Sequence, residues 1–508
     1  MIRSCAAGAI LHGFFTLRLT LTRPYFLNDA EFGHWYYRLF EFPEPIRPLV
    51  LQLVFTVLPI VYLALVGAWY LARYGRAACW IGGVAGVTSA GLIVAAAPKT
   101  AEPIRDSTMD RPLNVIVIGS DSLRGDRLGF SGYRPARQDG PAAAGVSPNL
   151  DRLAAESVQF KRCFTSIAST LESGVQVMTS TYPHTHGLRH MYPDRNSVEA
   201  VEQETTPIAK LLRDRGYHTA AIGDWCAGYY HLTPLGFEDI SVSNFDNFKI
   251  YMSQAVLMSH FVVPLYFDNP MGHRIFPQIG SFAQFVTPEV VTNRVKDALN
   301  ARARDGRPFF WHVFYSCNHL PYRSKEPYLS MFADPDYRGP NRNGVDFDID
   351  EFIGGTDLES KWKALPAEEI RQIRALYDGC TRLFDDCVGQ ILTELENLGL
   401  DENTLVVVTS DHGDDLYEPG VTLGHGLTFN GGLHANHVPL LMRLPGADPD
   451  VVNETVRLVD LAPTLAEILD VSLPDSWEGR SFKSWIGDPG RRYHRPFYGE
   501  TGFPFIQF

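Results

Sequence analysis

From residue 113 onward, the sequence alternates short apolar runs with longer amphipathic segments, and this alternation restricts the fold more than any other feature. Apolar runs of strand length lie at 113–119, 217–223, 308–315, 404–409 and 437–444. Segments with helical periodicity lie at 147–158, 206–215, 288–302, 366–398 and 458–469. Buried strands that alternate with helices are typical of a parallel sheet. We therefore expect an α/β domain over residues 112–508, a doubly wound, mainly parallel sheet with helices on both faces.

Two long apolar runs precede this domain, at residues 49–72 and 77–97. Each is about as long as a helix that crosses a hydrocarbon core of roughly 30 Å. A third and weaker candidate, Cys5–Thr22, is interrupted by His12 and Arg18. The alternative interpretation of the two long runs is a buried hairpin of a soluble protein. The sequence favours two or three transmembrane helices.

The basic residues between the two runs predict the orientation. Arg73 and Arg76 lie in the short connection, and basic connections favour the cytoplasmic side. The chain would then be a multi-pass cell-membrane protein with its C-terminal domain in the periplasm or outside the cell. We expect a membrane region over residues 1–98, a linker over residues 99–111, and the α/β domain after it.

The charge of the chain restricts its partners. The formal net charge is −13 at pH 7. Proteins that bind nucleic acids neutralise phosphates with a basic face, so the acidic balance argues against a nucleic-acid partner. The sequence gives no indication of the oligomeric state.

Polar residues follow several of the predicted strands. Asp121 follows the first apolar run, His319 follows the third, and Asp411 and His412 follow the fourth. In such folds ligands bind beyond the carboxyl ends of the strands, so these residues are expected at one edge of the sheet. Mixed oxygen and nitrogen ligands suit zinc or manganese better than calcium. We therefore predict one divalent metal ion there; for Asp121 alone, a surface position in a turn is the alternative.

Residues 169–189 begin as a turn that enters a helix. A hydroxyl at a helix N-terminus meets a positive dipole and free N–H groups, which favour an oxyanion and its phosphorylated product. A nearby metal ion would lower the pKa of the hydroxyl further. Thr170 is therefore the candidate nucleophile, with a plain helix cap as the alternative.

Several motifs occur in one order and carry a family resemblance. They are NVIVIGSDSLRGDRLG at 114–129, SPNLDRLAAESVQF at 147–160, the stretch 170–187, SCNHLPY at 316–322, TSDHGDD at 409–415, LGHG at 423–426, HVPLLMRLPG at 437–446, and VDLAPTLAEIL at 459–469 with EGRSF after it. Together they resemble the sulfatase branch of the alkaline phosphatase superfamily over roughly residues 112–485. The resemblance implies a doubly wound fold, a divalent metal ion and a covalent intermediate.

The nucleophile position can be carried over residue by residue. In sulfatases the nucleophile opens a C/S-x-P-S-R motif, and a Thr-Gly pair begins nine residues later, ahead of Tyr-Pro-His. Here Thr179 precedes the matching Tyr182–His184, and counting back nine residues gives Thr170. Threonine cannot become the formylglycine of sulfatases, and Glu172 and Gly174 replace the family's proline and arginine.

Other departures concern the groups that bind the anion. Sulfatases usually have two adjacent aspartate ligands, and here the second is Ser122. Their G-K-W-H-L-G segment supplies a lysine and a histidine to the sulfate, whereas Asp224 and Cys226 stand at those positions here. Because an aspartate would repel a sulfate, these departures argue against sulfate-ester hydrolysis.

The departures resemble another branch instead. Phosphoethanolamine and phosphoglycerol transferases also have a threonine nucleophile, Asp–His metal ligands and an extracytoplasmic domain behind membrane helices, although their metal carboxylate is typically glutamate where this chain has Asp121. We therefore predict a membrane-anchored, metal-dependent phosphate-ester hydrolase or phospho-group transferase that acts through a phosphothreonine. Its substrate would be a phosphate ester, with lipids and glycans as candidate classes. The alternatives are a sulfuric ester hydrolase and a non-catalytic membrane scaffold on the same fold.

The resemblance also implies roles for the site residues. The expected metal ligands are Asp121, Thr170, Asp411 and His412. His319 and His425 match positions that contact the transferred or leaving group, where a histidine can protonate an alkoxide; ordinary loop polarity is the alternative. Structural or solvated positions are expected for Asp414, Asp415, His184, His186, His434 and His437.

Residues 251–267 are strongly apolar and fall where family members vary. We favour a buried core helix for this segment. A lid that dips toward a bilayer and a lipid substrate is the alternative.

Overall fold

The structure is a computed structural model. It describes residues 2–23, 112–189, 193–243, 263–277, 285–346, 365–419, 423–425, 433–488 and 492–500, together with a few single positions between these ranges. The chain divides into two compact units, one formed by residues 1–102 and 257–267 and the other by residues 103–256 and 268–508. The predicted domain limits at 98 and 112 stay predictions.

The first unit contains helix α1 (Ile2–Thr22) and the short π-helical turn η6 (Val263–Phe267). Tyr266 joins them, because its hydroxyl lies 2.7 Å from Nδ1 of His12. Its ring also packs edge-to-face on Phe15, with the ring centroids 5.2 Å apart. The described end of the apolar segment 251–267 therefore packs with the N-terminal helix.

The predicted membrane region requires a correction. Among the helices that the structure describes, none is long and apolar enough to cross a membrane. Helix α1 includes His12 and Arg18, whose polar side chains are costly in hydrocarbon. Apart from Leu49, Leu53 and Val57, the runs 49–72 and 77–97 lie outside the described residues. The predictions of N-terminal transmembrane helices and of a multi-pass cell-membrane protein are contradicted by this finding and are withdrawn.

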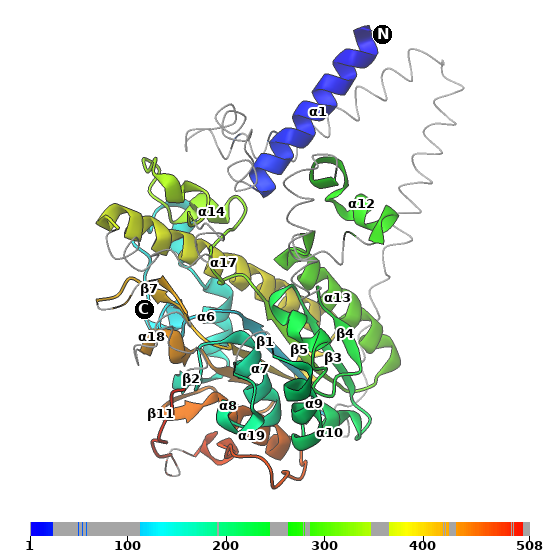
Figure 1. Ribbon diagram of the computed structural model, residues 1–508, viewed down its shortest axis with the longest axis vertical. Coiled ribbons are helices and arrows are strands. Elements are labelled where there is room, and N and C mark those ends of the chain that lie inside the picture. The colour runs from blue at the N-terminus through cyan, green and yellow to red at the C-terminus, as the bar shows by residue number, and fades with distance from the viewer. Residues whose placement is uncertain are drawn as a thin grey trace. The chain divides into compact units, whose positions relative to one another are not determined.

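A nine-stranded sheet forms the centre of the second unit (Figure 1). Its strands are β1 (Asn114–Ser120), β2 (Val158–Phe164), β3 (His218–Gly223), β4 (Asp239–Ser241), β5 (Phe309–Tyr315), β6 (Thr404–Thr409), β9 (His437–Val438), β10 (Leu441–Arg443) and β11 (Asp450–Arg457). The order is β11-β2-β10-β6-β1-β5-β3-β4, and β9 pairs with β2. Strands β6, β1, β5, β3 and β4 are parallel, whereas β10 runs antiparallel to β2 and β6. The α/β prediction is confirmed, with a mixed sheet.

Helices cover both faces of this sheet. Figure 1 shows α13 (Pro288–Asp305) and α17 (Ala367–Asn397) on one side of the central strands, and α7 (Thr170–Thr179) and α19 (Leu461–Ile468) on the other. Phe310 and Phe314 share a hydrophobic core with α7 and α19. Tyr315 points the opposite way and packs edge-to-face on Phe384 of α17. Every residue of β1 and β5 is consequently buried, which explains their unbroken apolar runs.

Hydrogen bonds between neighbouring strand ends fix the edge where polar residues gather. Ser410, just after β6, donates from Oγ to the Ser120 carbonyl at the end of β1, at 2.6 Å. The Asn318 N–H, beyond β5, donates to Ser120 Oγ at 3.3 Å. The three central strands therefore present their carboxyl ends as one cross-linked platform.

Candidate metal centre and nucleophile

Asp121 stands at the middle of this platform, directly after β1. Its backbone N–H donates to the Tyr315 carbonyl at 2.7 Å, and its side chain is fully buried. Ser122 takes a left-handed backbone conformation and donates from Oγ to Asp121 Oδ1 at 3.0 Å. At this position, where sulfatases have a second aspartate, a hydroxyl orients the first carboxylate instead.

Asp411 and His412 converge on Asp121 from the neighbouring strand end. His412 Nε2 lies 3.5 Å from Asp121 Oδ1 and 3.4 Å from Asp411 Oδ2. Asp411 Oδ2 and His412 Nε2 are buried and have no hydrogen-bond partner. A buried polar atom without a partner costs about 1–3 kcal/mol, and one cation between these groups would satisfy both atoms. The residues therefore fit a divalent metal ion.

Burial and the charges of neighbouring groups shift the pKa values of Asp121, Asp411 and His412. Burial and the nearby Asp121 carboxylate raise the pKa of Asp411 well above its ordinary value. Burial alone would raise the pKa of Asp121, but neighbouring histidines, His319 first, lower it to about 2. Burial lowers the pKa of His412 to about 4. Two adjacent buried carboxylates cannot both be charged without a cation between them, so this arrangement of side chains favours the binding of a cation.

The His412 ring is held in the orientation that a metal ligand needs. Its Nδ1 lies 2.9 Å from the Gly413 carbonyl, which can only accept a hydrogen bond. Nδ1 therefore carries the proton, and Nε2 presents its lone pair toward the two carboxylates.

Thr170 is the first residue of α7 and is buried. Its Oγ1 donates to Asp121 Oδ2 at 3.2 Å. Ser169, not Thr170, occupies the N-cap position, so the plain-cap alternative does not describe this hydroxyl. Ser173, in the first turn of α7, donates from Oγ to the Asp411 carbonyl at 2.7 Å. The helix N-terminus is thus fixed beside the metal-binding group.

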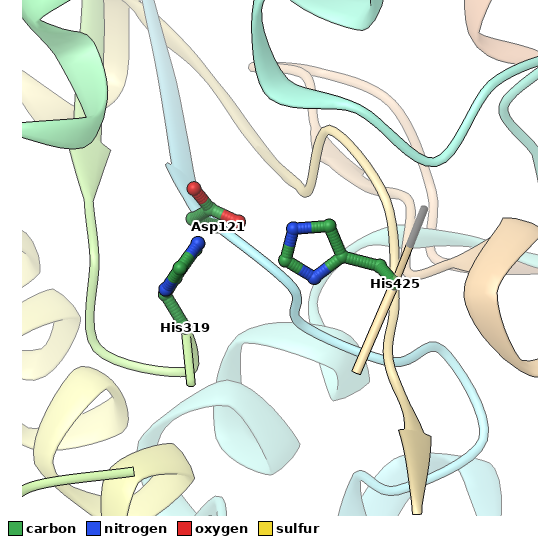
Figure 2. A group of neighbouring side chains, drawn as sticks. All are labelled: Asp121, His319 and His425. Carbon is green, nitrogen blue, oxygen red and sulfur yellow. The ribbon is translucent and has the colours of Figure 1, made fainter. Parts of the chain in front are cut away.

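His319 and His425 lie around the other side of Asp121 (Figure 2). A nitrogen atom of each ring and an oxygen of Asp121 all lie within 4.8 Å of one another. The two ring centroids are 5.1 Å apart, and the His425 ring lies 4.2 Å from that of His412. The structure therefore brings together all six predicted site residues.

Asp414 and Asp415 are buried, so the expectation of solvated loop positions is wrong for both. Asp414 Oδ1 lies 2.6 Å from His425 Nδ1, and the buried Tyr322 donates from its hydroxyl to Asp414 Oδ2 at 2.5 Å. Burial alone would lower the pKa of His425, but Asp414 raises it to about 9. The local sequence gave no indication of this contact between Asp414 and a predicted site histidine.

Asp224 and Cys226 stand where the lysine and histidine of sulfatases are expected. Asp224 is fully buried, and its carboxylate accepts from the Ser316 N–H and Oγ, both at 2.8 Å, and from the Cys226 N–H at 3.2 Å. Burial raises the pKa of Asp224 to about 6. Its oxygens thus bind protein donors that tie the loop after β3 to the loop after β5. The described site therefore lacks the two cationic side chains of the family pattern.

Gly174, which stands where the family has an arginine, allows a tyrosine to pack against the backbone of α7. A methyl group on Gly174 would lie 2.6 Å from Cζ of Tyr229 and would also overlap its hydroxyl. Tyr229 is buried, and burial raises its pKa well above the ordinary value, as do nearby groups that include Asp411 and Asp121. Nothing in the local sequence indicated this partner.

We expect Gly174→Ala to lower the free energy of unfolding by about 1–3 kcal/mol, because the tyrosine ring cannot move in a packed core. The loss should exceed the gain in helix propensity, roughly 1 kcal/mol. Urea unfolding measures it. Gly13→Ala is the control, since Gly13 is helical and a methyl group there meets nothing within 4 Å. Equal or greater stability of Gly174→Ala would contradict the packing described here.

An α/β fold with a mixed sheet, and with buried carboxylates, histidines and a hydroxyl at the strand ends, is typical of metal-dependent ester hydrolases. Sequence comparison gives the family. A profile of the family described as Sulfatase matches residues 113–471, and the chain belongs to this family. The protein is accordingly a hydrolase of the sulfatase and alkaline phosphatase superfamily.

Three relatives show the range of names found in this family. An arylsulfatase of Clostridium perfringens is 26% identical over 417 residues, which cover 77% of this chain and 82% of the relative. An ulvan-active sulfatase of Formosa agariphila is 24% identical, with 78% and 70% covered. The multifunctional alkaline phosphatase superfamily protein PehA of Trinickia caryophylli is 27% identical, with 74% and 77% covered. A crystal structure of the phosphonate monoester hydrolase of Agrobacterium radiobacter shares the fold, with a TM-score of 0.53, 21% identity, and 74% and 77% covered.

Proposed function

We propose that the protein hydrolyses a sulfate ester, with Thr170 as the nucleophile and a divalent cation held by Asp121, Asp411 and His412. The observation that carries this proposal is the pair of buried, unpartnered ligand atoms beside the Thr170 hydroxyl, in a chain of the sulfatase family. The names of the relatives favour a sulfate ester over the phosphate ester that the sequence analysis preferred. A sulfated glycan is a candidate substrate, since one relative is named as ulvan-active.

Each side chain has a step that its position supports. The Thr170 hydroxyl gives its proton to water, and Oγ1 attacks the sulfur atom in line. A bond from Oγ1 to sulfur forms while the bond from sulfur to the ester oxygen breaks. The N–H groups at the start of α7 stabilise charge on the sulfuryl oxygens. His319 or His425 donates a proton to the leaving oxygen. Water then cleaves the sulfothreonine.

The cation would supply Lewis-acid stabilisation of the negative charge and a lower pKa for the hydroxyl. Two carboxylates and one imidazole favour zinc or manganese over calcium. The protein contributes the orientation of these ligands: Ser122 positions Asp121, and the Gly413 carbonyl positions His412.

Hydrolysis of a phosphate ester is the second candidate, and the observation that favours it is the threonine at position 170. Threonine cannot form the aldehyde that sulfatases use, so water must open the covalent threonine ester by attack on its sulfur or phosphorus atom. The relative PehA is named as a multifunctional alkaline phosphatase superfamily protein, which makes substrates with either central atom reasonable.

A panel of matched substrates tests the proposal. Full-length protein loaded with zinc or manganese is assayed with nitrophenyl sulfate, nitrophenyl phosphate and a nitrophenyl phosphate diester, which share a leaving group. We expect the highest kcat/KM for the sulfate. A phosphate ester preferred by more than about tenfold, roughly 1.4 kcal/mol of transition-state stabilisation, would replace the first candidate by the second.

A further inference from the structure

Asp121 belongs to two groups of metal-binding side chains at once. One is the group with Asp411 and His412, and the other joins Asp121 to His319 and His425. We propose that Asp121 bridges two divalent cations, the second of which binds to Nε2 of His319 and Nε2 of His425. This inference deepens the proposed function and rests on it for the first cation. It replaces the proton donation assigned there to His319 and His425, because a ring whose Nε2 binds a cation has no proton for the leaving oxygen. The second cation would stabilise the charge on that oxygen instead.

The orientation of both rings supports the second site. Figure 2 shows one ring nitrogen of His319 and one of His425 directed toward the Asp121 carboxylate. The opposite nitrogen of each ring is occupied: His319 Nδ1 lies 2.5 Å from the Leu320 carbonyl, and His425 Nδ1 lies 2.6 Å from Asp414 Oδ1. Both partners can only accept, so Nδ1 carries a proton in each ring and Nε2 is the atom left to bind a cation beside Asp121. In His425 the cation would displace a proton from Nε2.

Histidines that bind metal ions almost always donate their other N–H to a carboxylate or a backbone carbonyl. His412 has the same arrangement through Gly413. Asp414 is itself fixed by the Tyr322 hydroxyl, so the support of His425 extends to a second buried residue. A histidine that only packed in a loop would not need such a chain of buried partners.

The charge balance of the site also favours a second cation. Asp121, Asp411 and Asp414 are buried carboxylates around the histidines. When all three carboxylates are ionised and His425 is protonated, one divalent cation leaves this group without net charge, which gives no attraction for an anionic ester. A second divalent cation that displaces the His425 proton makes the group net positive. It would supply the charge that the family's lysine and histidine provide and that Asp224 and Cys226 do not.

The competing account makes His319 and His425 proton donors with no metal between them. The two accounts differ in metal content, which can be measured without turnover. Full-length protein is stripped with a chelator, dialysed against buffered zinc and analysed by inductively coupled plasma mass spectrometry. We expect two zinc ions per chain, and one in His319→Ala and in His425→Ala. Thermal melting of each variant shows whether it is folded, and His425→Gln, which keeps a polar side chain, is a second variant in case His425→Ala is not.

His184→Ala is the matched control, because His184 is exposed and pairs with Glu500; it should keep two ions. Manganese supplies a second readout, since a bridged pair gives an exchange-coupled electron paramagnetic resonance signal.

One zinc ion in the parent protein, or two in both folded His319 and His425 variants, would overturn the second site. Sulfate turnover with one ion would leave the proposed function standing, whereas two ions without ester turnover would contradict that function and not the site.

Discussion

Thr170→Ala is expected to lower kcat/KM for the preferred ester by at least about 10³-fold while the metal content stays the same. The substitution removes the oxygen that forms the bond to sulfur or phosphorus, and loss of a covalent nucleophile is among the largest single effects in enzymes. The fold should tolerate it, because the Thr170 side chain makes one neutral-to-charged hydrogen bond, to Asp121, at 3.2 Å. Steady-state kinetics and metal analysis of the same preparation measure both effects.

Thr170→Ser is the control for this result, because it keeps the hydroxyl at the helix N-terminus. We expect its kcat/KM to fall by no more than about tenfold, about 1.4 kcal/mol. Mass spectrometry of an acid-quenched reaction should place a sulfuryl or phosphoryl group on Thr170. An alanine variant that retains a tenth or more of the activity would exclude Thr170 as the nucleophile.

Asp411→Asn should reduce kcat/KM by about 10³-fold, and excess zinc or manganese should restore part of it. The amide removes one anionic ligand, and metal-ion stabilisation of the transition state contributes several kcal/mol. In the metal-free protein the same change should raise the melting temperature, because it removes the repulsion between two buried carboxylates, Asp411 and Asp121. Activity would thus be lost while the metal-free fold gains stability.

Thermal melting with and without chelator separates these two effects. Asp475→Asn is the control, since Asp475 is exposed and should change neither the activity nor the melting temperature. Full activity of Asp411→Asn would remove Asp411 from the metal centre. A lower melting temperature of its metal-free form would show instead that the carboxylate stabilises the fold by itself.

The central strands could be predicted because both of their faces are buried. β1 and β5 read as continuous apolar runs. β2 and β11 were missed, since each is partly exposed and carries charged residues such as Arg162 and Glu454. The antiparallel direction of β10 was also missed, because three residues of strand carry no information about direction. Local composition therefore indicated burial and not strand pairing.

The residues of the candidate site that come directly after a strand could be predicted from the sequence. Asp121, His319, Asp411 and His412 each follow a strand, so they were predicted at one edge of the sheet, where the structure has them. Asp414 was not predicted, because a buried aspartate cannot be told from any loop aspartate without its partner Tyr322, which is far away in the sequence. Side chains whose role depends on one distant neighbour leave no local signal.

The first unit is built from two separate segments of the chain, and this limits how the protein can be cut into fragments. The polypeptide passes between the units after residues 102, 256 and 267. A fragment that starts at residue 112 would keep Tyr266 and lose both of its aromatic partners, His12 and Phe15. Such a fragment would carry a newly uncovered aromatic surface and a tendency to self-associate. Truncation at the apparent linker is therefore a poor way to obtain the hydrolase, and co-expression of the N-terminal segment with the remainder is the better design.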